Sequence, residues 1–177
     1  MRLASATVQT SYESPLGPII LAATNEQLTG AWFAGQRHQP DPSSWPVAPD
    51  HPVLQQARQQ LSDYFAKRRT SFDLPLQLGS GTPFQQAVWR ALLQIPHGSH
   101  CSYGELAARI GKPAAVRAVG AAVGRNPVSV IVPCHRALGA HGALTGYAAG
   151  LGRKAALLQH ENPDLTAPGL RADAPVV

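Results

Sequence analysis

Ile131-Val132-Pro133-Cys134-His135-Arg136 places a thiol directly beside an imidazole at the end of a short apolar run. The β-branched residues predict a buried strand, and Pro133 predicts where that strand breaks and presents a side chain. A thiol becomes a strong nucleophile as the thiolate, which a neighbouring His, cation or helix dipole favours. The alternative is a structural cysteine, because free cysteine is among the most buried residue types. This stretch alone leaves both interpretations open.

The residues before this run predict a helix-turn-helix. Tyr103 to Gly111 is expected to form a short helix, and Lys112-Pro113 then opens a second helix from Ala114 to about Gly124. The second helix is rich in alanine and glycine and carries one long cation, Arg117. Reading base edges in the major groove takes several polar side chains, so small residues favour close approach to the minor groove instead. The alternative is an Ala-rich helix packed in a core.

The first half of the chain predicts strands followed by one helix. Residues 19–23 and 28–33 are expected to form a hairpin, with an edge strand at residues 8–12. Apolar residues recur at helical spacing between Val53 and Phe65, and residues 72–76 are a candidate return to the sheet. No constellation in this half carries chemistry, so its aromatic and aliphatic residues are expected in the core.

A change in composition around Leu78-Gly79-Ser80-Gly81 predicts a domain boundary, with one domain at residues 1–79 and a second at 80–161. Thr82-Pro83-Phe84-Gln85 is typical of a helix start, because Thr82 and Gln85 can form a capping box around a first-turn proline. Residues 162–177 are expected to form a loosely ordered tail. The predicted fold class is α+β: a small sheet-and-helix domain, then a mostly helical domain with the helix-turn-helix and a short strand bearing the reactive cysteine.

Composition and charge limit the classes of function. The chain has 177 residues, of which 44% are hydrophobic, and only 2 are cysteines, too few for a disulfide framework or a Cys-rich zinc site. No apolar run approaches the ~20 residues of a membrane span, and the start of the chain lacks a secretory signal, which fits the cytoplasm. Residues 80–161 carry 8 basic against 2 acidic residues, whereas residues 1–79 are balanced. This asymmetry favours an anionic partner, and nucleic acid is the commonest one; a basic surface that serves only solubility is the alternative.

The motifs together resemble the methylated-DNA–protein-cysteine methyltransferases, which repair guanine alkylated on its exocyclic oxygen. The resemblance rests on Ile131 to Arg136, on Arg117-Ala118-Val119-Gly120 and Asn126-Pro127 before it, on Ser14-Pro15-Leu16-Gly17, and on Phe84-Gln85-Gln86-Ala87-Val88-Trp89. It extends over nearly the whole chain. It implies a ribonuclease-H-like first domain and a monomer that reacts once, binds double-stranded DNA through the minor groove and clusters along it. Alkylated thymine would be a poorer substrate than alkylated guanine.

The resemblance also implies roles for individual residues. Cys134 would accept the alkyl group, His135 would be its base through a water, and Glu161 would orient His135. Asn126 would be the hinge between recognition helix and reactive strand, and Tyr103 would donate a proton to the departing guanine. Arg117 would fill the gap left by the extruded nucleotide. The remaining expected DNA or substrate contacts are Ala115, Val116, Ala118, Ala121, Ser129, Arg136, Tyr147, Ala148 and Ala149.

Some positions depart from the family pattern. Ser129 replaces a proline of some relatives, and Ala148-Ala149 replace Ser or Gly, which changes the width expected for the pocket. No metal and no cofactor are expected, because zinc-binding cysteines are missing from the first half and no dinucleotide fingerprint is present. Cys101 is expected to be a spectator. The rival classes are a cysteine hydrolase, which would need an oxyanion hole, and a DNA-binding sensor without transfer activity.

Overall fold

Alternating apolar and polar residues near the start of the chain form three antiparallel strands in the computed structural model, which describes residues 6–165. They are β1 (Thr7–Ser14), β2 (Gly17–Thr24) and β3 (Gln27–Phe33), paired in the order β1-β2-β3. The turn between β1 and β2 needs a glycine, because Gly17 has φ +111°, a conformation that L-residues rarely adopt. The predicted hairpin and edge strand are both confirmed.

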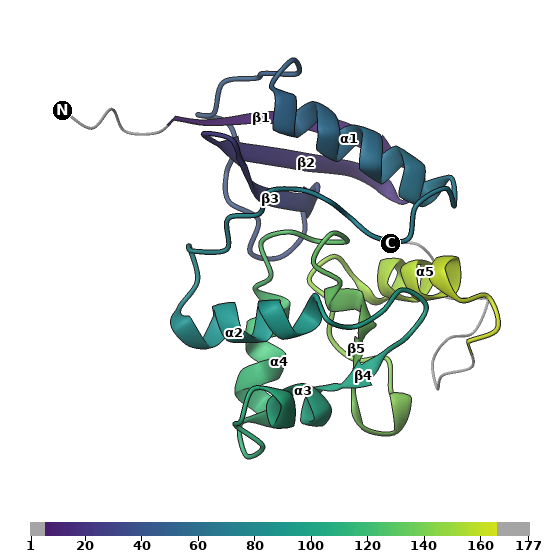
Figure 1. Ribbon diagram of the computed structural model, residues 1–177. Helices are drawn as coiled ribbons and strands as arrows, with labels where there is room; N and C mark the ends of the chain where they lie inside the picture. Colours follow the sequence, from purple (N-terminus) through teal and green to yellow (C-terminus); the bar gives the residue numbers. More distant parts are fainter. Residues whose placement is uncertain (1–5, 166–177) are drawn as a thin grey trace.

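Helix α1 (Pro52–Phe65) covers one face of this sheet (Figure 1). It buries Leu54, Ala57, Leu61 and Tyr64, which recur at helical spacing as the sequence predicts. The candidate return to the sheet at residues 72–76 is confirmed only at Leu76, which forms a single parallel bridge to Leu28. Pro75 has no amide hydrogen to continue a ladder, so the pairing stops there.

Three helices build the lower half of the molecule in Figure 1: α2 (Pro83–Leu92), α3 (Tyr103–Arg109) and α4 (Val116–Gly124). The capping box at the start of α2 is confirmed, with the amide of Gln85 donating to the Thr82 hydroxyl. Helices α3 and α4 form the predicted helix-turn-helix. Helix α4 begins at Val116, two residues later than expected, with Ala115 as its N-cap.

The reactive cysteine lies on a helical turn. Cys134–Arg136 form a short 3₁₀ helix, η1, and strand β5 (Ala137–Leu138) begins one residue later and pairs in parallel with β4 (Cys101–Ser102). The predicted strand before Cys134 is therefore wrong. Residues 129–132 form a tight turn instead, in which Val130 has φ +71°. A second 3₁₀ turn, η2 (Ala140–Gly142), precedes the last helix, α5 (Leu151–Glu161).

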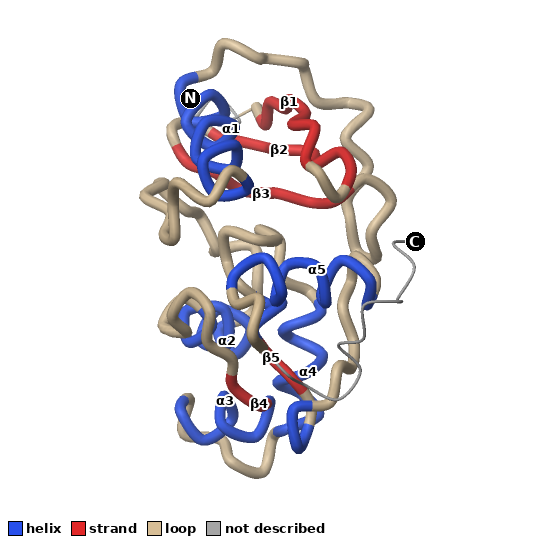
Figure 2. The backbone as a smooth tube through the Cα atoms, turned by 90° about the vertical axis from the view of Figure 1, so that its right-hand side faces the viewer, coloured by secondary structure: helices blue, strands red, loops and turns tan. Residues whose placement is uncertain are grey.

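Backbone hydrogen bonds join the two halves. Ala31 of β3 forms two of these bonds. Its amide donates to the Pro127 carbonyl at 2.9 Å, and its carbonyl accepts from the Ser129 amide at 2.8 Å. Helix α5 lies between the sheet and the lower helices in both views (Figure 1, Figure 2). One apolar core runs through both halves, and the α+β prediction is confirmed. Of the predicted tail, residues 166–177 lie outside the described residues.

None of the helices within residues 6–165 has the length and apolar character that crossing a membrane requires.

Candidate active site

Cys134 and His135 point in different directions from one turn. The amide of Cys134 donates to the Val132 carbonyl at 2.8 Å, so the chain curls at Pro133. A 3₁₀ helix has about three residues per turn, which turns neighbouring side chains by roughly 120° instead of onto opposite faces. Cys134 is 5% exposed and His135 is fully buried. The turn therefore presents the thiol while it keeps the imidazole inside.

Asn126 fixes the loop that leads to this turn. Its side-chain amide donates to the carbonyls of Val128 (3.3 Å) and Val132 (2.9 Å), and its oxygen accepts from the amide of Val128 at 3.0 Å. The loop contains Val130 at φ +71°, which is strained for a β-branched residue. Such strain persists only where surrounding bonds hold it. The buried Asn126 supplies those bonds, next to the end of α4.

Glu161, the last residue of α5, is the centre of a buried hydrogen-bond network. His135 Nε2 lies 2.7 Å from Oε1, and the guanidinium of Arg136 donates to both carboxylate oxygens at 2.8 Å. Burial alone raises the pKa of the Glu161 carboxyl, but the hydrogen bonds and charges of His135 and Arg136 outweigh it and hold that pKa well below its usual range. The carboxylate is thus ionised and accepts every bond.

The ionised carboxylate decides the tautomer of His135. Because Glu161 can only accept, Nε2 of His135 carries the hydrogen and Nδ1 carries the free lone pair. Burial lowers the pKa of His135, although Glu161 partly opposes the shift, so the ring is neutral near pH 7. Nδ1 is buried and has no hydrogen-bond partner among the described residues. His135 is therefore a neutral base with its lone pair available.

Lys154 on α5 is a charged residue that sequence reasoning missed. It is fully buried, and its ammonium donates to the carbonyls of Thr145 (2.9 Å) and Gly146 (3.1 Å) and to the Tyr103 hydroxyl (3.4 Å). Burial lowers its pKa to about 8. The available signal was helical spacing: Lys154, Leu157, Leu158 and Glu161 stand at i, i+3, i+4 and i+7, on the inward face.

Burial raises the pKa of the Cys134 thiol, and three side chains oppose that shift. They are the Asn126 amide, the positive charge of Lys154 and the Tyr147 hydroxyl, in decreasing order. The hydroxyl of Tyr147 is buried, and burial together with the nearby thiol raises its pKa. The site thus surrounds a desolvated thiol with an amide, a cation and a phenol, which is how proteins favour a thiolate in a dry cavity.

Tyr64 was expected only in the core, yet it belongs to the same network. Its hydroxyl donates to Glu161 Oε1 at 2.8 Å, across 97 positions in the sequence, from α1 of the N-terminal domain. The structure thus adds a hydrogen bond from the first half of the chain to Glu161, and the expectation that this half carries no catalytic constellation stays a prediction. An aromatic residue on the apolar face of a helix gave no sign that its hydroxyl meets the buried carboxylate of Glu161.

A cavity of about 330 Å³ is lined by Tyr147, whose hydroxyl also interacts with the Cys134 thiol. Helix α4 contributes Gly120, Ala121 and Gly124, and residues 146–148 form another side. Tyr103 also lines it, with its hydroxyl donating to the Thr145 carbonyl at 3.1 Å. Binding pockets for small organic groups occupy about 300–1,000 Å³. The cavity therefore has room for a nucleobase, and it joins the predicted residues Tyr103, Ala121, Tyr147 and Ala148.

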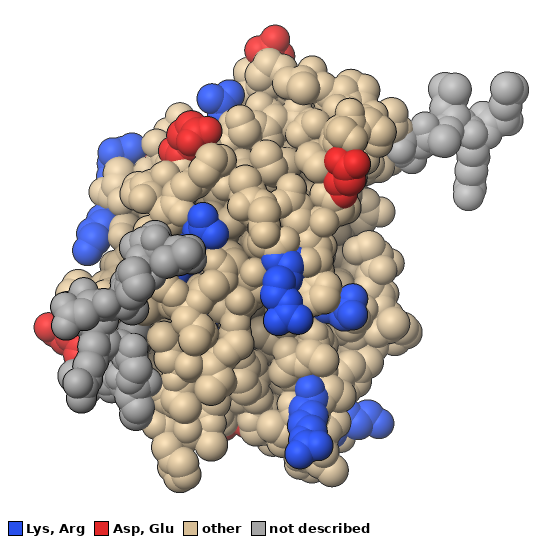
Figure 3. Space-filling view, turned by 180° about the vertical axis from the view of Figure 1, so that it is seen from behind, with Lys and Arg blue, Asp and Glu red and all other residues tan. Residues whose placement is uncertain are grey.

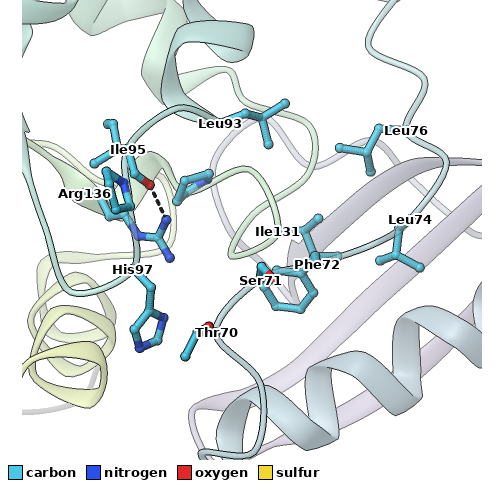
Figure 4. Close-up of a pocket in the computed structure, with 12 residues that line it drawn as sticks. Thr70, Ser71, Phe72, Leu74, Leu76, Leu93, Ile95, His97, Ile131 and Arg136 are labelled. Atoms are coloured by element: carbon cyan, nitrogen blue, oxygen red, sulfur yellow. Dashed lines mark hydrogen bonds between the residues drawn. The ribbon is translucent and has the colours of Figure 1, made fainter.

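Three predicted contacts lie elsewhere. Arg136 is buried, binds Glu161 and donates to the Ile95 carbonyl at 2.6 Å, so its guanidinium does not face DNA. Figure 4 shows it at the edge of a separate cavity of about 200 Å³ behind the reactive turn. Ser129 is buried and donates to the Gln36 side chain at 3.2 Å, toward the first domain. Ala149 packs in the core.

The outer face of α4 carries the other predicted DNA contacts. Arg117, Ala118 and Ala121 are exposed, Val116 is 40% exposed, and Ala115 is half-buried at the N-cap. The inner face packs through Val119, Ala122 and Val123. On one side of the molecule, several Lys and Arg side chains lie over the lower half (Figure 3). The helix thus offers a surface of small residues with one long cation.

The described residues contain no group of three or more metal-ligating side chains. Cys101 is buried, and burial raises its pKa to about 11, as expected for a thiol that stays protonated.

A thiol next in sequence to a His–Glu pair, close to Tyr147 of a nucleobase-sized cavity that a helix-turn-helix also lines, indicates a DNA-binding protein with a reactive cysteine. Two family models match the chain. One is described as 6-O-methylguanine DNA methyltransferase, ribonuclease-like domain, and matches residues 7–78; the other is the DNA binding domain of the same family and matches residues 83–163. The chain belongs to this family.

Curated relatives are similar over most of their length. A methylated-DNA–protein-cysteine methyltransferase of Mycobacterium tuberculosis is 50% identical over 149 residues, which cover 84% of this chain and 88% of the relative. The protein of the same name from Methanosarcina acetivorans is 48% identical over 151 residues, which cover 85% of this chain and 95% of the relative. A crystal structure of M. tuberculosis OGT in complex with DNA superimposes with a TM-score of 0.81 at 46% identity, over 89% of this chain and 93% of that one.

Proposed function

We propose that the chain removes alkyl groups from the exocyclic oxygen of guanine in DNA, and less well from thymine, by transferring them to Cys134. The observation that carries this function is the position of the thiol: it neighbours Tyr147, which lines a nucleobase-sized cavity, and it directly precedes a neutral histidine that hydrogen-bonds an ionised glutamate. The family named above supports the same reaction.

The reaction begins with loss of a proton from Cys134. A bridging water passes this proton to Nδ1 of His135, the atom with the free lone pair. Lys154, Asn126 and the Tyr147 hydroxyl stabilise the thiolate that forms. Glu161 stabilises the resulting imidazolium through Nε2, at 2.7 Å. This arrangement follows the logic of a catalytic triad with sulfur in place of oxygen.

The thiolate then attacks the alkyl carbon. A carbon–sulfur bond forms as the carbon–oxygen bond breaks, and the electron pair of the broken bond leaves with the guanine. Tyr103 donates the proton that neutralises this guanine, a step worth typically ~10²–10⁴-fold in rate. Lys154, 3.4 Å from the Tyr103 hydroxyl, stabilises the phenolate until the proton held by His135 returns. The thioether has no labile acyl carbon, so each molecule reacts once.

Helix α4 is proposed to bind the minor groove. The target base is buried in a duplex, and rotating it into the cavity costs a few kcal/mol. The small exposed residues of α4 allow close approach, and the exposed Arg117 offsets part of the cost by filling the space that the base leaves. We further propose that the protein acts as a monomer, clusters along DNA and works in the cytoplasm.

Intact-mass analysis tests the function directly. After incubation with duplex DNA that contains O6-methylguanine, the protein should gain one methyl group on the peptide with Cys134, while a Cys134→Ser variant gains none. Turnover beyond one equivalent would reject the single-turnover mechanism. Binding of the modified duplex without any gain in mass would instead favour the rival function of a damage sensor.

A further inference from the structure

The loop after β3 carries the N-terminal domain to the mouth of the base cavity. The amide of Arg37 donates to the Ala148 carbonyl at 3.0 Å, and the Gln36 side chain accepts from the Phe33 amide at 2.8 Å and from the Ser129 hydroxyl at 3.2 Å. Gln36 is itself buried. These bonds fix the loop on both sides, so the residues that follow Gln36 have a defined place beside the cavity.

Arg37 and His38 line this cavity together with Arg125, which follows α4. Both side chains of the loop are exposed, and no Asp or Glu is among the lining residues. Within residues 6–165, no carboxylate forms an ion pair with Arg37. The facing surface of α4 is open, because a Cβ added at Gly120 or Gly124 would meet no atom within 4 Å. Two uncommitted guanidinium groups thus flank an uncovered entrance.

A base that enters the cavity leaves its phosphates at this entrance. Sugar and phosphate cannot follow the base into the cavity, because the backbone of an extruded nucleotide stays joined to the duplex. A guanidinium presents donors in a planar fork that matches phosphate oxygens. We propose that Arg37 of the N-terminal domain binds a backbone phosphate next to the extruded nucleotide, opposite the phosphates that face α4. This inference rests on the proposed function, and it gives the first domain a direct part in binding the damaged strand.

The test compares Arg37→Ala with Arg58→Ala. Arg58 is an exposed arginine of the same domain on α1, where it lines a separate groove with Gln55 and Gln59. Affinity for a duplex with one O6-methylguanine is measured against salt concentration in a Cys134→Ser background, which keeps binding at equilibrium. Single-turnover rates are measured with Cys134 intact, on the same duplex and on free O6-methylguanine.

The salt slope is the slope of the logarithm of the binding constant against the logarithm of salt concentration. Loss of one phosphate contact should make this slope shallower by about 0.9 in Arg37→Ala, and Arg58→Ala should leave it unchanged. The rate on subsaturating duplex should fall about tenfold in Arg37→Ala, and the rate on the free base, which has no phosphate, by at most about twofold. Arg37→Lys should recover part of the duplex rate, because it keeps the charge without the fork.

Two results would overturn the proposal. One is a salt slope for Arg37→Ala equal to that of Arg58→Ala. The other is an equal loss of rate on duplex and free base, which would make Arg37 a residue that only shapes the cavity. If the wild-type protein transferred no alkyl group at all, the proposed function would fail, yet the salt slopes of the non-reacting variants would still decide whether Arg37 contacts a phosphate.

Discussion

Replacing Tyr64 by phenylalanine removes one hydroxyl from the network that orients the active-site histidine. That hydroxyl lies 2.8 Å from Glu161 Oε1, the atom that also takes hydrogen bonds from His135 at 2.7 Å and Arg136 at 2.8 Å. The ring itself stays, so its packing against Phe65 and its neighbours in the core is preserved. The substitution therefore isolates the effect of one donor on a shared carboxylate oxygen.

The expected magnitude follows from the charge of the acceptor. A hydrogen bond to an ionised group contributes about 1.5–3 kcal/mol, and since two donors remain on Oε1 we expect a loss of about 1–2 kcal/mol in the free energy of unfolding. The carboxylate, less stabilised, then attracts the proton on His135 more strongly and raises the pKa of His135.

The assay is the rate of alkyl transfer as a function of pH, measured in single turnover beside urea unfolding. Because neutral His135 is the proposed base, a raised pKa moves the acid limb of the profile to higher pH in Tyr64→Phe. Tyr12→Phe is the matched control, since Tyr12 stacks on the same Phe65 without touching Glu161. A Tyr64→Phe protein that is less stable but keeps the wild-type acid limb would refute the coupling, and the hydroxyl would then be only structural.

Three further changes have defined outcomes. The pKa of Lys154 is lowered from 10.5 to about 8, so between these pH values the unfolded chain binds more protons than the folded one. The free energy of unfolding of the wild type should therefore rise with pH by up to about 3 kcal/mol over this range, relative to Lys154→Met. Urea unfolding at pH 7.5 and 10 measures this, and an equal pH dependence of the two proteins would contradict it. Arg136→Met leaves the buried Glu161 charge short of its main partner and should cost about 3–5 kcal/mol in unfolding free energy, whereas a loss below about 1 kcal/mol would mean that the pair is not needed. Arg117→Ala should lower the transfer rate on duplex strongly and on free O6-methylguanine little; equal losses in the two rates would exclude a role in base extrusion.

The sequence identified the elements whose causes are local. The capping box at Thr82 and Gln85, the hairpin and the helix-turn-helix depend on residues a few positions apart, so their spacing predicts them. It also predicts roles for Cys134, His135 and Glu161, through the resemblance of a short motif to a family. The sequence analysis predicted strands that are too long where one residue interrupts the pairing. Pro75 interrupts the return to the sheet at residues 72–76, and Val130 interrupts the strand expected before the cysteine.

The chemical environment of the thiol was decided by the tertiary structure. Tyr64 meets Glu161 across 97 positions, and Arg37 reaches the base cavity from the other domain, because β3 and the loop at residues 127–129 share backbone hydrogen bonds. The same packing turned Arg136 from an expected DNA contact into the partner of a buried carboxylate. A charge contributes according to its burial and its neighbours, which depend on contacts between residues far apart in the chain. Residue types thus set which groups were available, and the fold set which of them act on one sulfur atom.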